Sequence, residues 1–153
     1  MRVALFQPDI AGNVGTTLRL GACMGVPVDL IEPMGFPWGA AALRRAGMDY
    51  TQAVEVRRHA DWEAFRAATP ARLVLATTRG AVVLWDARFE EGDVLVLGSE
   101  GRGVPEQVHE AAGLRVAIPM RAGMRSLNVA IAGAMVLGEM LRQVRSTSLE
   151  PNG

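Results

Sequence analysis

The most distinctive segment of the chain is the glycine-rich stretch 97–105, Leu-Gly-Ser-Glu-Gly-Arg-Gly-Val-Pro, which follows an apolar run directly. Glycine tolerates positive φ and has no side chain, so a ligand can lie against bare backbone in such a loop. The spacing matches neither the G-x-G-x-x-G fingerprint of dinucleotide-binding proteins nor a Walker loop, which needs Gly-Lys-Ser/Thr. The stretch therefore predicts either a loop that binds a ligand of another kind or a plain flexible connection between a strand and a helix.

A second unusual segment, 118–130, precedes the last apolar helix pattern of the chain. Pro119 and Gly123 shape a turn, and Ser126 is predicted to cap the helix that follows. Asn128 stands at the first turn of that helix, although asparagine is a poor helix former unless its side chain bonds nearby backbone. We therefore expect Asn128 to hold a neighbouring loop or to contact a ligand.

Histidine and cysteine offer little chemistry by position. His59 and His109 lie outside both loops and are interpreted as surface residues. Cys23 falls in an apolar-rich helix pattern and is expected in the core. A single cysteine excludes an intramolecular disulfide and a multi-cysteine metal site, so no metal is predicted.

Short apolar runs that alternate with helix patterns set the predicted architecture. Strands are expected at 3–6, 28–31, 54–57, 72–77, 94–97 and 115–118, and helices at 13–24, 40–46, 61–68, 105–112 and 127–144. Asn13 and Asp61 are predicted helix caps, and 81–84 is predicted as a loop or a short edge strand. Continuous apolar strands separated by helices favour a parallel α/β sheet covered on both faces. Ligands of such sheets bind beyond the carboxyl ends of the strands, where both unusual loops begin.

Length and composition are those of an ordinary globular domain. The chain has 153 residues, of which 50% are hydrophobic and 21% charged, and we expect one domain over 1–145 with a flexible tail over 146–153. No signal peptide and no membrane span are predicted, because the longest apolar stretch, 127–141, is short and interrupted by polar residues. The cytoplasm is the expected location.

Charge gives only a local hint of a nucleic-acid partner. The 16 basic and 16 acidic residues cancel, and every basic residue is arginine. Arg115, Arg121 and Arg125 lie in a segment without acidic residues, which could contact a phosphate backbone or form a solvated loop.

Three motifs together resemble a known family. Segments 98–105 and 118–130 are similar to the last two motifs of SPOUT-class RNA 2′-O-methyltransferases, and Asn-Val-Gly-Thr-Thr-Leu-Arg at 13–19 resembles their first. Segments 29–36 and 43–50 are also similar to the small subfamily that methylates the wobble nucleotide of tRNA. The resemblance covers nearly the whole chain.

The resemblance implies a mostly parallel sheet flanked by helices, with a deep trefoil knot in its C-terminal part. It also implies S-adenosyl-L-methionine as cofactor, tRNA as partner, and a homodimer in which each active site takes residues from both chains. The positions that it assigns to the cofactor are Ala76, Thr77, Gly98, Glu100, Gly103, Ile118, Met120, Ser126 and Leu127.

The same resemblance assigns catalysis to Arg19, Asn128 and Ser126. A ribose 2′-hydroxyl is a weak nucleophile, so it must be positioned, deprotonated or both. Because arginine is charged at nearly all pH values, orienting the RNA phosphate and stabilising the developing oxyanion is the role expected of Arg19. A helix-surface arginine is the plain alternative. Glu100 is expected to pair with Arg102 or to hold Arg19. The residues expected to contact RNA are Asn13, Arg19, Arg44, Arg45, Arg121 and Arg125.

Three functions remain open from the sequence. The first is methylation of the wobble ribose, at cytidine or a modified uridine of leucine tRNA. The second is methylation of another tRNA or rRNA ribose, because the Ser-Leu-Asn-Val segment is shared with such enzymes. The third is a non-catalytic nucleotide- or RNA-binding module. Gly138, where some relatives have tyrosine, leaves any tyrosine-assisted step in doubt.

Overall fold

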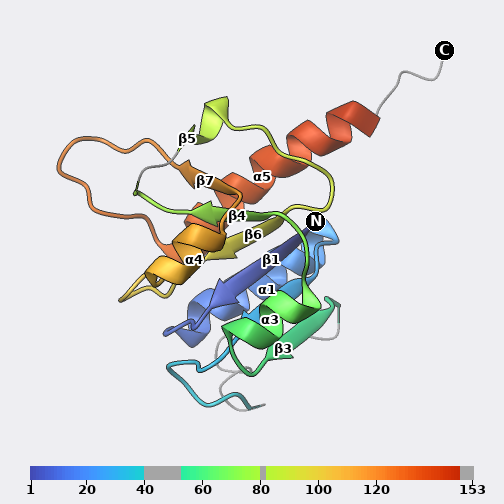
Figure 1. Ribbon diagram of the computed structural model, residues 1–153, viewed down its shortest axis with the longest axis vertical. Helices are drawn as coiled ribbons and strands as arrows, with labels where there is room; N and C mark the ends of the chain where they lie inside the picture. Colours follow the sequence, from blue (N-terminus) through green and yellow to red (C-terminus); the bar gives the residue numbers. More distant parts are fainter. Residues whose placement is uncertain (40–52, 80–81, 149–153) are drawn as a thin grey trace.

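The structure is a parallel sheet between two layers of helices (Figure 1). This computed structural model describes residues 1–39, 53–79 and 82–148. The strands are β1 (Arg2–Phe6), β2 (Val28–Ile31), β3 (Val56–His59), β4 (Leu73–Ala76), β5 (Val82–Val83), β6 (Val94–Leu97) and β7 (Leu114–Ala117). Within the described ranges they form one sheet in the order β3-β2-β1-β6-β4-β7-β5, and each neighbouring pair is parallel.

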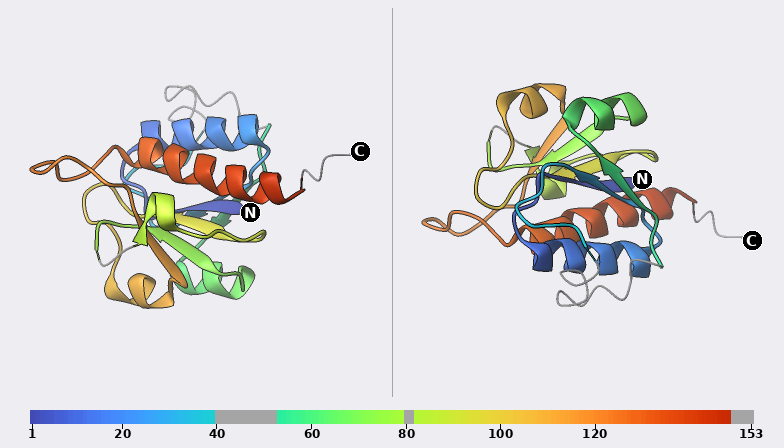
Figure 2. Two further views of the ribbon diagram at one scale, coloured as in Figure 1. Left: turned by 90° about the horizontal axis from the view of Figure 1, so that it is seen from above. Right: turned by 90° about the horizontal axis from the view of Figure 1, so that it is seen from below.

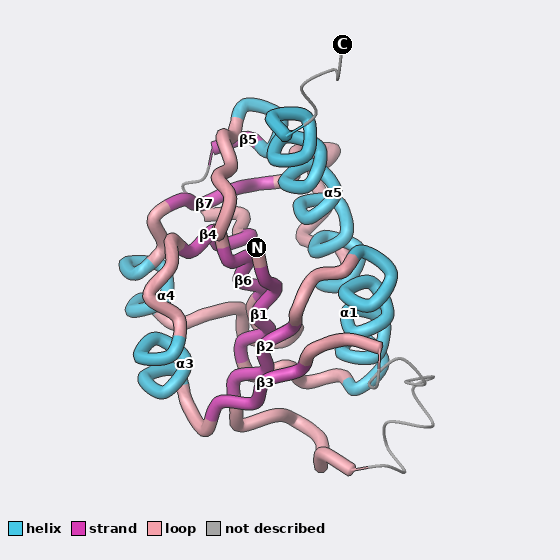
Figure 3. Tube along the Cα trace, turned by 90° about the vertical axis from the view of Figure 1, so that its right-hand side faces the viewer, coloured by secondary structure: helices cyan, strands magenta, loops and turns pink. Residues whose placement is uncertain are grey.

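Helices cover both faces of the sheet, as Figure 2 shows. The helices are α1 (Ala11–Met24), α3 (Trp62–Ala68), α4 (Glu106–Ala111), α5 (Val129–Ser148) and the short 3-10 helix η2 (Leu84–Asp86). α1 and α5 pack together on one face, and α3 and α4 lie on the other (Figure 3). The predicted α/β class, with a mostly parallel sheet flanked by helices, is confirmed.

The two faces of β1 illustrate how the core is built. Val3 and Leu5 point to the cluster beneath α1 and α5, whereas Ala4 and Phe6 belong to the cluster beneath α3 and α4. Successive side chains of a strand point to opposite faces, so a central strand in this sandwich must be apolar throughout. Burial on both faces of the sheet therefore explains the continuous apolar runs of the sequence.

α5 lies unusually close to the end of β6. A Cβ atom on Gly133 would stand 2.6 Å from Cδ1 of Leu97, so no larger residue fits without a shift. The start of α5 is therefore held against the strand that leads into the glycine-rich loop.

Most predicted boundaries agree with the structure to within one or two residues, but both predicted caps around the site are wrong. α1 begins at Ala11, so Asn13 lies inside its first turn and Ile10 holds the cap position. α5 begins at Val129, where Oδ1 of Asn128, not Ser126, accepts hydrogen bonds from the backbone N–H groups of Ala130 and Ile131 at 2.9 and 3.2 Å.

Away from the site, some predicted elements agree with the structure and others do not. Oδ1 of Asp61 caps α3 as predicted, and the segment near 81–84 contains the edge strand β5. α5 ends at Ser148, later than expected. The helix predicted at 40–46 lies outside the described residues. No helix in the described ranges is long and apolar enough to cross a membrane.

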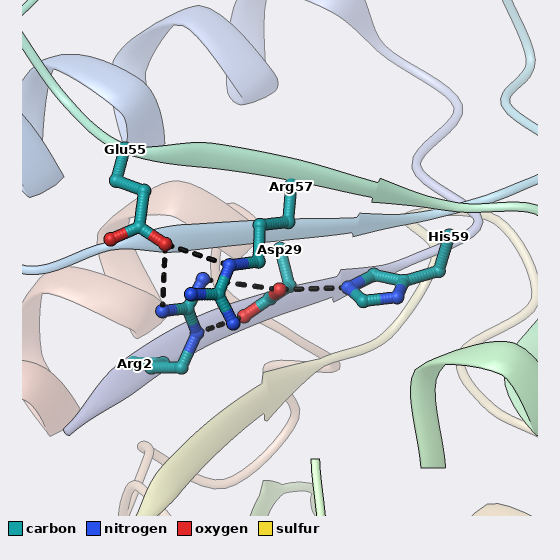
Figure 4. Close-up of polar contacts among 5 residues, drawn as sticks. All are labelled: Arg2, Asp29, Glu55, Arg57 and His59. Atoms are coloured by element: carbon teal, nitrogen blue, oxygen red, sulfur yellow. Dashed lines mark hydrogen bonds and ion pairs between the residues drawn. The ribbon is translucent and has the colours of Figure 1, made fainter. Parts of the chain in front are cut away.

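The prediction of a surface position for His59 is wrong, because the side chain is buried in a polar cluster at the edge of the sheet (Figure 4). Nε2 of His59 lies 2.8 Å from Oδ1 of the fully buried Asp29, and Nε of Arg2 donates to Oδ2 of the same carboxylate at 2.6 Å. Glu55 contacts Arg2 from the exposed rim of the cluster. Asp29 thus links β1, β2 and β3. Cys23, expected in the core, is exposed instead.

Replacing Asp29 by alanine is expected to lower the free energy of unfolding by about 3–5 kcal/mol, because it removes a fully buried carboxylate and leaves the partly buried guanidinium of Arg2 without its main partner. The matched control is Glu55→Ala, which removes a half-exposed partner of the same arginine and should cost about 0–1 kcal/mol. Urea denaturation of the two variants measures both values. Equal losses would contradict the central position given to Asp29.

Candidate functional site

A cavity of about 570 Å³ lies at the carboxyl ends of the central strands. This volume falls within the usual range of small-molecule sites. Its walls come from the loops after β4, β6 and β7 and from the starts of α1 and α5. The lining residues are Ile10, Asn13, 76–79, 97–100, 102–104, His109, Val116, Ile118, Met120, 126–129 and Ala132.

Every residue that the sequence assigned to a cofactor lines this cavity. The set comprises Ala76, Thr77, Gly98, Glu100, Gly103, Ile118, Met120, Ser126 and Leu127. Asn13 and Asn128 line it too. The parallel sheet brings them together, because β4, β6 and β7 are neighbours whose carboxyl ends lie at the same edge.

The predicted arginines occupy different positions. Arg19 is exposed on α1 and lies outside the cavity lining formed by the described residues. Arg121 and Arg125 are exposed in the loop between β7 and α5, which projects from the body of the protein (Figure 2). Arg44 and Arg45, with the rest of the 43–50 segment, lie outside the described residues. One chain thus provides the cavity, but Arg19, Arg121 and Arg125 are not among its lining residues.

The glycine-rich loop folds back on itself. The backbone N–H of Ser99 donates to the carbonyl of Gly103 at 3.0 Å, and the N–H of Gly103 donates to the carbonyl of Ser99 at 2.8 Å. Gly103 has φ +66°, and a Cβ atom on Gly98 would meet the carbonyl carbon of Gly103 at 2.9 Å. The loop is therefore a tight turn that presents backbone to the cavity, not a flexible connector.

Hydrogen bonds between side chains join the three motif segments. Nδ2 of Asn128 donates to Oδ1 of Asn13 at 2.9 Å, and Nδ2 of Asn13 donates to Oε1 of Glu100 at 2.8 Å. Oε2 of Glu100 accepts from the backbone N–H of Asp9 at 2.7 Å. These partners of Glu100 differ from the two arginines that the sequence suggested. Asn128 both caps α5 and holds a neighbouring segment, which is one of its two predicted roles.

Asp9 fastens the glycine-rich loop from the other side and was not predicted. Its carboxylate accepts hydrogen bonds from the hydroxyl of Ser99 and the backbone N–H of Gly101, and these bonds hold the pKa of Asp9 below its ordinary value. The carboxylate is therefore ionised at neutral pH, and its hydrogen bonds hold the glycine-rich loop in place. The position of Asp9 could have predicted this contact, because Asp9 follows β1, and the carboxyl end of β1 lies beside that of β6.

Thr78, Arg79 and His109 are among the lining residues that the sequence did not assign to the site. Arg79 forms an exposed ion pair with Glu106 at 3.0 Å. The surface position predicted for His109 is wrong, because its side chain is only 5% exposed. Its place in the last turn of a short helix gave no sign of burial. Among the described residues, His, Cys, Asp and Glu do not gather into a group that could hold a metal ion.

The arrangement suits a protein that binds an organic ligand against bare backbone at the edge of an α/β sheet. Comparison with known proteins gives the family. Residues 1–138 match the SpoU rRNA Methylase family, and the chain therefore belongs to this family of RNA methyltransferases.

Relatives of known name agree with this membership. The chain is 56% identical over 146 residues to the tRNA (cytidine(34)-2′-O)-methyltransferase of Ancylobacter novellus, covering 94% of this chain and 92% of the relative. A solved structure that gives insights into the 2-OH methylation of C/U34 on tRNA superimposes with a TM-score of 0.89, at 40% identity, over 95% of this chain and 96% of that one. An AdoMet-bound rRNA methyltransferase from Sinorhizobium meliloti superimposes with a TM-score of 0.83, at 28% identity, over 92% of this chain and 55% of that one.

Gly98→Ala should destabilise the protein by about 1–3 kcal/mol, because the added methyl group pushes against the backbone of Gly103. Gly12→Ala is the matched control: Gly12 lies in α1, where an added Cβ atom would meet no other group within 4 Å, so alanine should stabilise by about 0.5–1 kcal/mol. Chemical denaturation reports both. A neutral Gly98→Ala would show that the turn tolerates a side chain.

Proposed function

We propose that this protein is a homodimeric enzyme that methylates the 2′-hydroxyl of the wobble nucleotide, position 34, in leucine tRNA. As a member of the SpoU family it is an RNA 2′-O-methyltransferase whose methyl donor is S-adenosyl-L-methionine. The main support for the proposal is the convergence of three motif segments on one cavity, linked by Asn13, Glu100 and Asn128, in a chain 56% identical to a named cytidine(34) enzyme.

The cavity fits this methyl donor. Gly98 and Gly103 expose backbone, and Leu97, Val116 and Ile118 provide apolar wall. Thr77, Arg79, Glu100 and Arg102 add polar and charged groups that suit an amino-acid moiety. When bound, the cofactor supplies a methyl group on a positively charged sulfur. The residues of the chain hold that group still and exclude water around it, so positioning is their main contribution.

The proposed role of Arg19 is to orient the RNA phosphate and to stabilise the charge that develops on the ribose oxygen. Because Arg19 lies outside the cavity lining described for its own chain, we propose that it acts at the cavity of the partner subunit. Ser126 and Asn128 complete the proposed catalytic group from the cavity's own chain.

An exposed apolar surface around the start of α5 supports the homodimer. Ile131 and Met135 are 52% and 37% exposed on α5, and Ile10 and Leu127 are 51% and 40% exposed beside the cavity. Such a patch on one face is typical of an interface. Ala130, Ala134 and Gly138 recur at helical spacing on α5 and could allow close approach of a second subunit. This stripe of small residues is only partly available, because Ala130 is buried in its own chain while Gly138 is exposed.

The choice of RNA rests on the relatives, which include a named cytidine(34) enzyme and a solved structure concerned with C/U34 of tRNA. We propose one methyltransferase domain, 1–145, that contacts the RNA directly, and an exposed anticodon loop with unstacked bases suits such recognition. We propose Asn13, Arg121 and Arg125 as RNA contacts, together with Arg44 and Arg45. An rRNA ribose is the second candidate, since the family is described by rRNA methylation.

Two further parts of the proposal follow from family membership. The C-terminal part of the chain, from β4 to α5, is proposed to form the deep trefoil knot of SPOUT proteins; it contains three of the loops that meet at the cavity. The cytoplasm, where tRNA is modified, is the proposed location.

Arg19→Ala and Gly98→Ala are each expected to abolish methyl transfer to tRNA, for different reasons: the first loses the RNA phosphate contact and the second the cofactor. If Arg19 acts at the cavity of the partner subunit, co-expression of the two variants should restore about a quarter of wild-type turnover. Half of the dimers then contain one chain of each variant, and each such dimer has one intact site out of two. Tritium transfer from labelled cofactor measures this. An inactive mixture of folded variants that still exchange subunits would place Arg19 in the site of its own chain.

The target is tested with leucine tRNA transcripts in which each anticodon-loop ribose in turn lacks its 2′-hydroxyl. Methylation should disappear only with the 2′-deoxy substitution at position 34, because no acceptor oxygen remains there. A transcript with the substitution at position 32 is the matched control and should be methylated normally. Continued methylation of the 34-deoxy transcript would move the target to another ribose.

A further inference from the structure

His109 lies in the wall of the cofactor cavity, and one nitrogen of its buried ring, Nδ1, has no hydrogen-bond partner among the described residues. The residue belongs to α4 and is 5% exposed. Its Nδ1 is closed off from solvent. A buried nitrogen in this state destabilises the free protein, since a leucine of similar size would fill the same space without an unsatisfied group.

The cavity that His109 lines has both apolar and polar lining residues. Val104 and Val116 line the cavity with it. The groups suited to the carboxylate and ammonium of an amino acid, such as Arg79, Glu100 and Arg102, lie in the loops after β4 and β6. A flat base fits an apolar wall interrupted by one imidazole, and adenine offers both ring nitrogens that accept and an amine that donates. Either tautomer of a neutral histidine therefore has a complement on the base.

We infer that His109 is a cofactor-binding residue whose imidazole hydrogen-bonds the adenine base of the methyl donor. The ring turns when the ligand binds, so that Nδ1, which is closed off in the free protein, reaches the base and gains the partner that it lacks. The inference rests on the cofactor assigned to the family and does not depend on which RNA is methylated.

The first experiment measures S-adenosylhomocysteine binding by calorimetry, without RNA and without turnover. His109→Leu should weaken binding roughly three- to ten-fold, the effect of losing one hydrogen bond. Glu110→Leu, at the exposed neighbouring position of α4, is the matched control and should bind as the wild type does. If the wild type itself fails to bind, the enzyme assignment falls; if His109→Leu binds as tightly as the wild type, only this inference falls.

Thermal unfolding separates a binding role from a structural one. Without ligand, His109→Leu should unfold at the same temperature as the wild type or higher, because it removes an unsatisfied buried nitrogen. With saturating S-adenosylhomocysteine its rise in Tm should be smaller than that of the wild type. A lower Tm without ligand together with an unchanged ligand-induced rise would assign His109 to the core and overturn the inference.

Analogues of the ligand identify the contact. Each replaces one ring nitrogen of the adenine by carbon, or the exocyclic amine by an oxo group. The wild type should discriminate against one of them, and His109→Leu should bind that analogue as well as it binds S-adenosylhomocysteine. If His109→Leu loses the same factor for S-adenosylhomocysteine and for every analogue, the contact does not involve the base and the inference is wrong.

Discussion

The site depends on one carboxylate, that of Glu100. Its two oxygens accept hydrogen bonds from the side chain of Asn13 and from the backbone of Asp9, and Asn13 in turn accepts one from Asn128, which caps α5. Segments from the beginning, the middle and the end of the domain thereby take fixed positions around one cavity. Hydrogen bonds to a carboxylate are stronger than those between neutral groups, so this carboxylate is well suited to hold loops that have little apolar contact of their own. Without it, the turn at 98–103 would be tied to the body of the protein mainly through Asp9.

The fold was predictable because each of its elements is encoded locally. The apolar run of β6 ends where the glycine-rich loop begins, and the predicted and observed bounds of that strand are the same. Strands buried on both faces have no alternation to interpret, but their lengths and the helices between them indicate a parallel sheet. The cavity was predictable for the same reason, because the ends of parallel strands lie at one edge.

The errors arose where a side chain has a distant partner. Asn13 has the type and position of a helix cap, yet its amide bonds Glu100, which lies 87 residues away in the sequence. His59 is buried because Asp29, 30 residues earlier, accepts its hydrogen bond within the sheet. Neither pairing leaves a local pattern, since only the register of the strands brings the partners together. His109 differs from both, because no described residue bonds its buried Nδ1.

The position of β1 in the middle of the sheet has a consequence for the order in which the protein forms. β1 pairs with β2 on one side and with β6 on the other, where Val3 is opposite Leu95. Because β1 is synthesised well before β6, its second edge stays uncovered until β6 has been made. Pairings between distant segments form slowly, because the loop between them must close first. During synthesis the apolar edge of β1 is open to other strands, and nascent chains of this topology are expected to need protection by chaperones until α5, which closes one face of the sheet, has emerged.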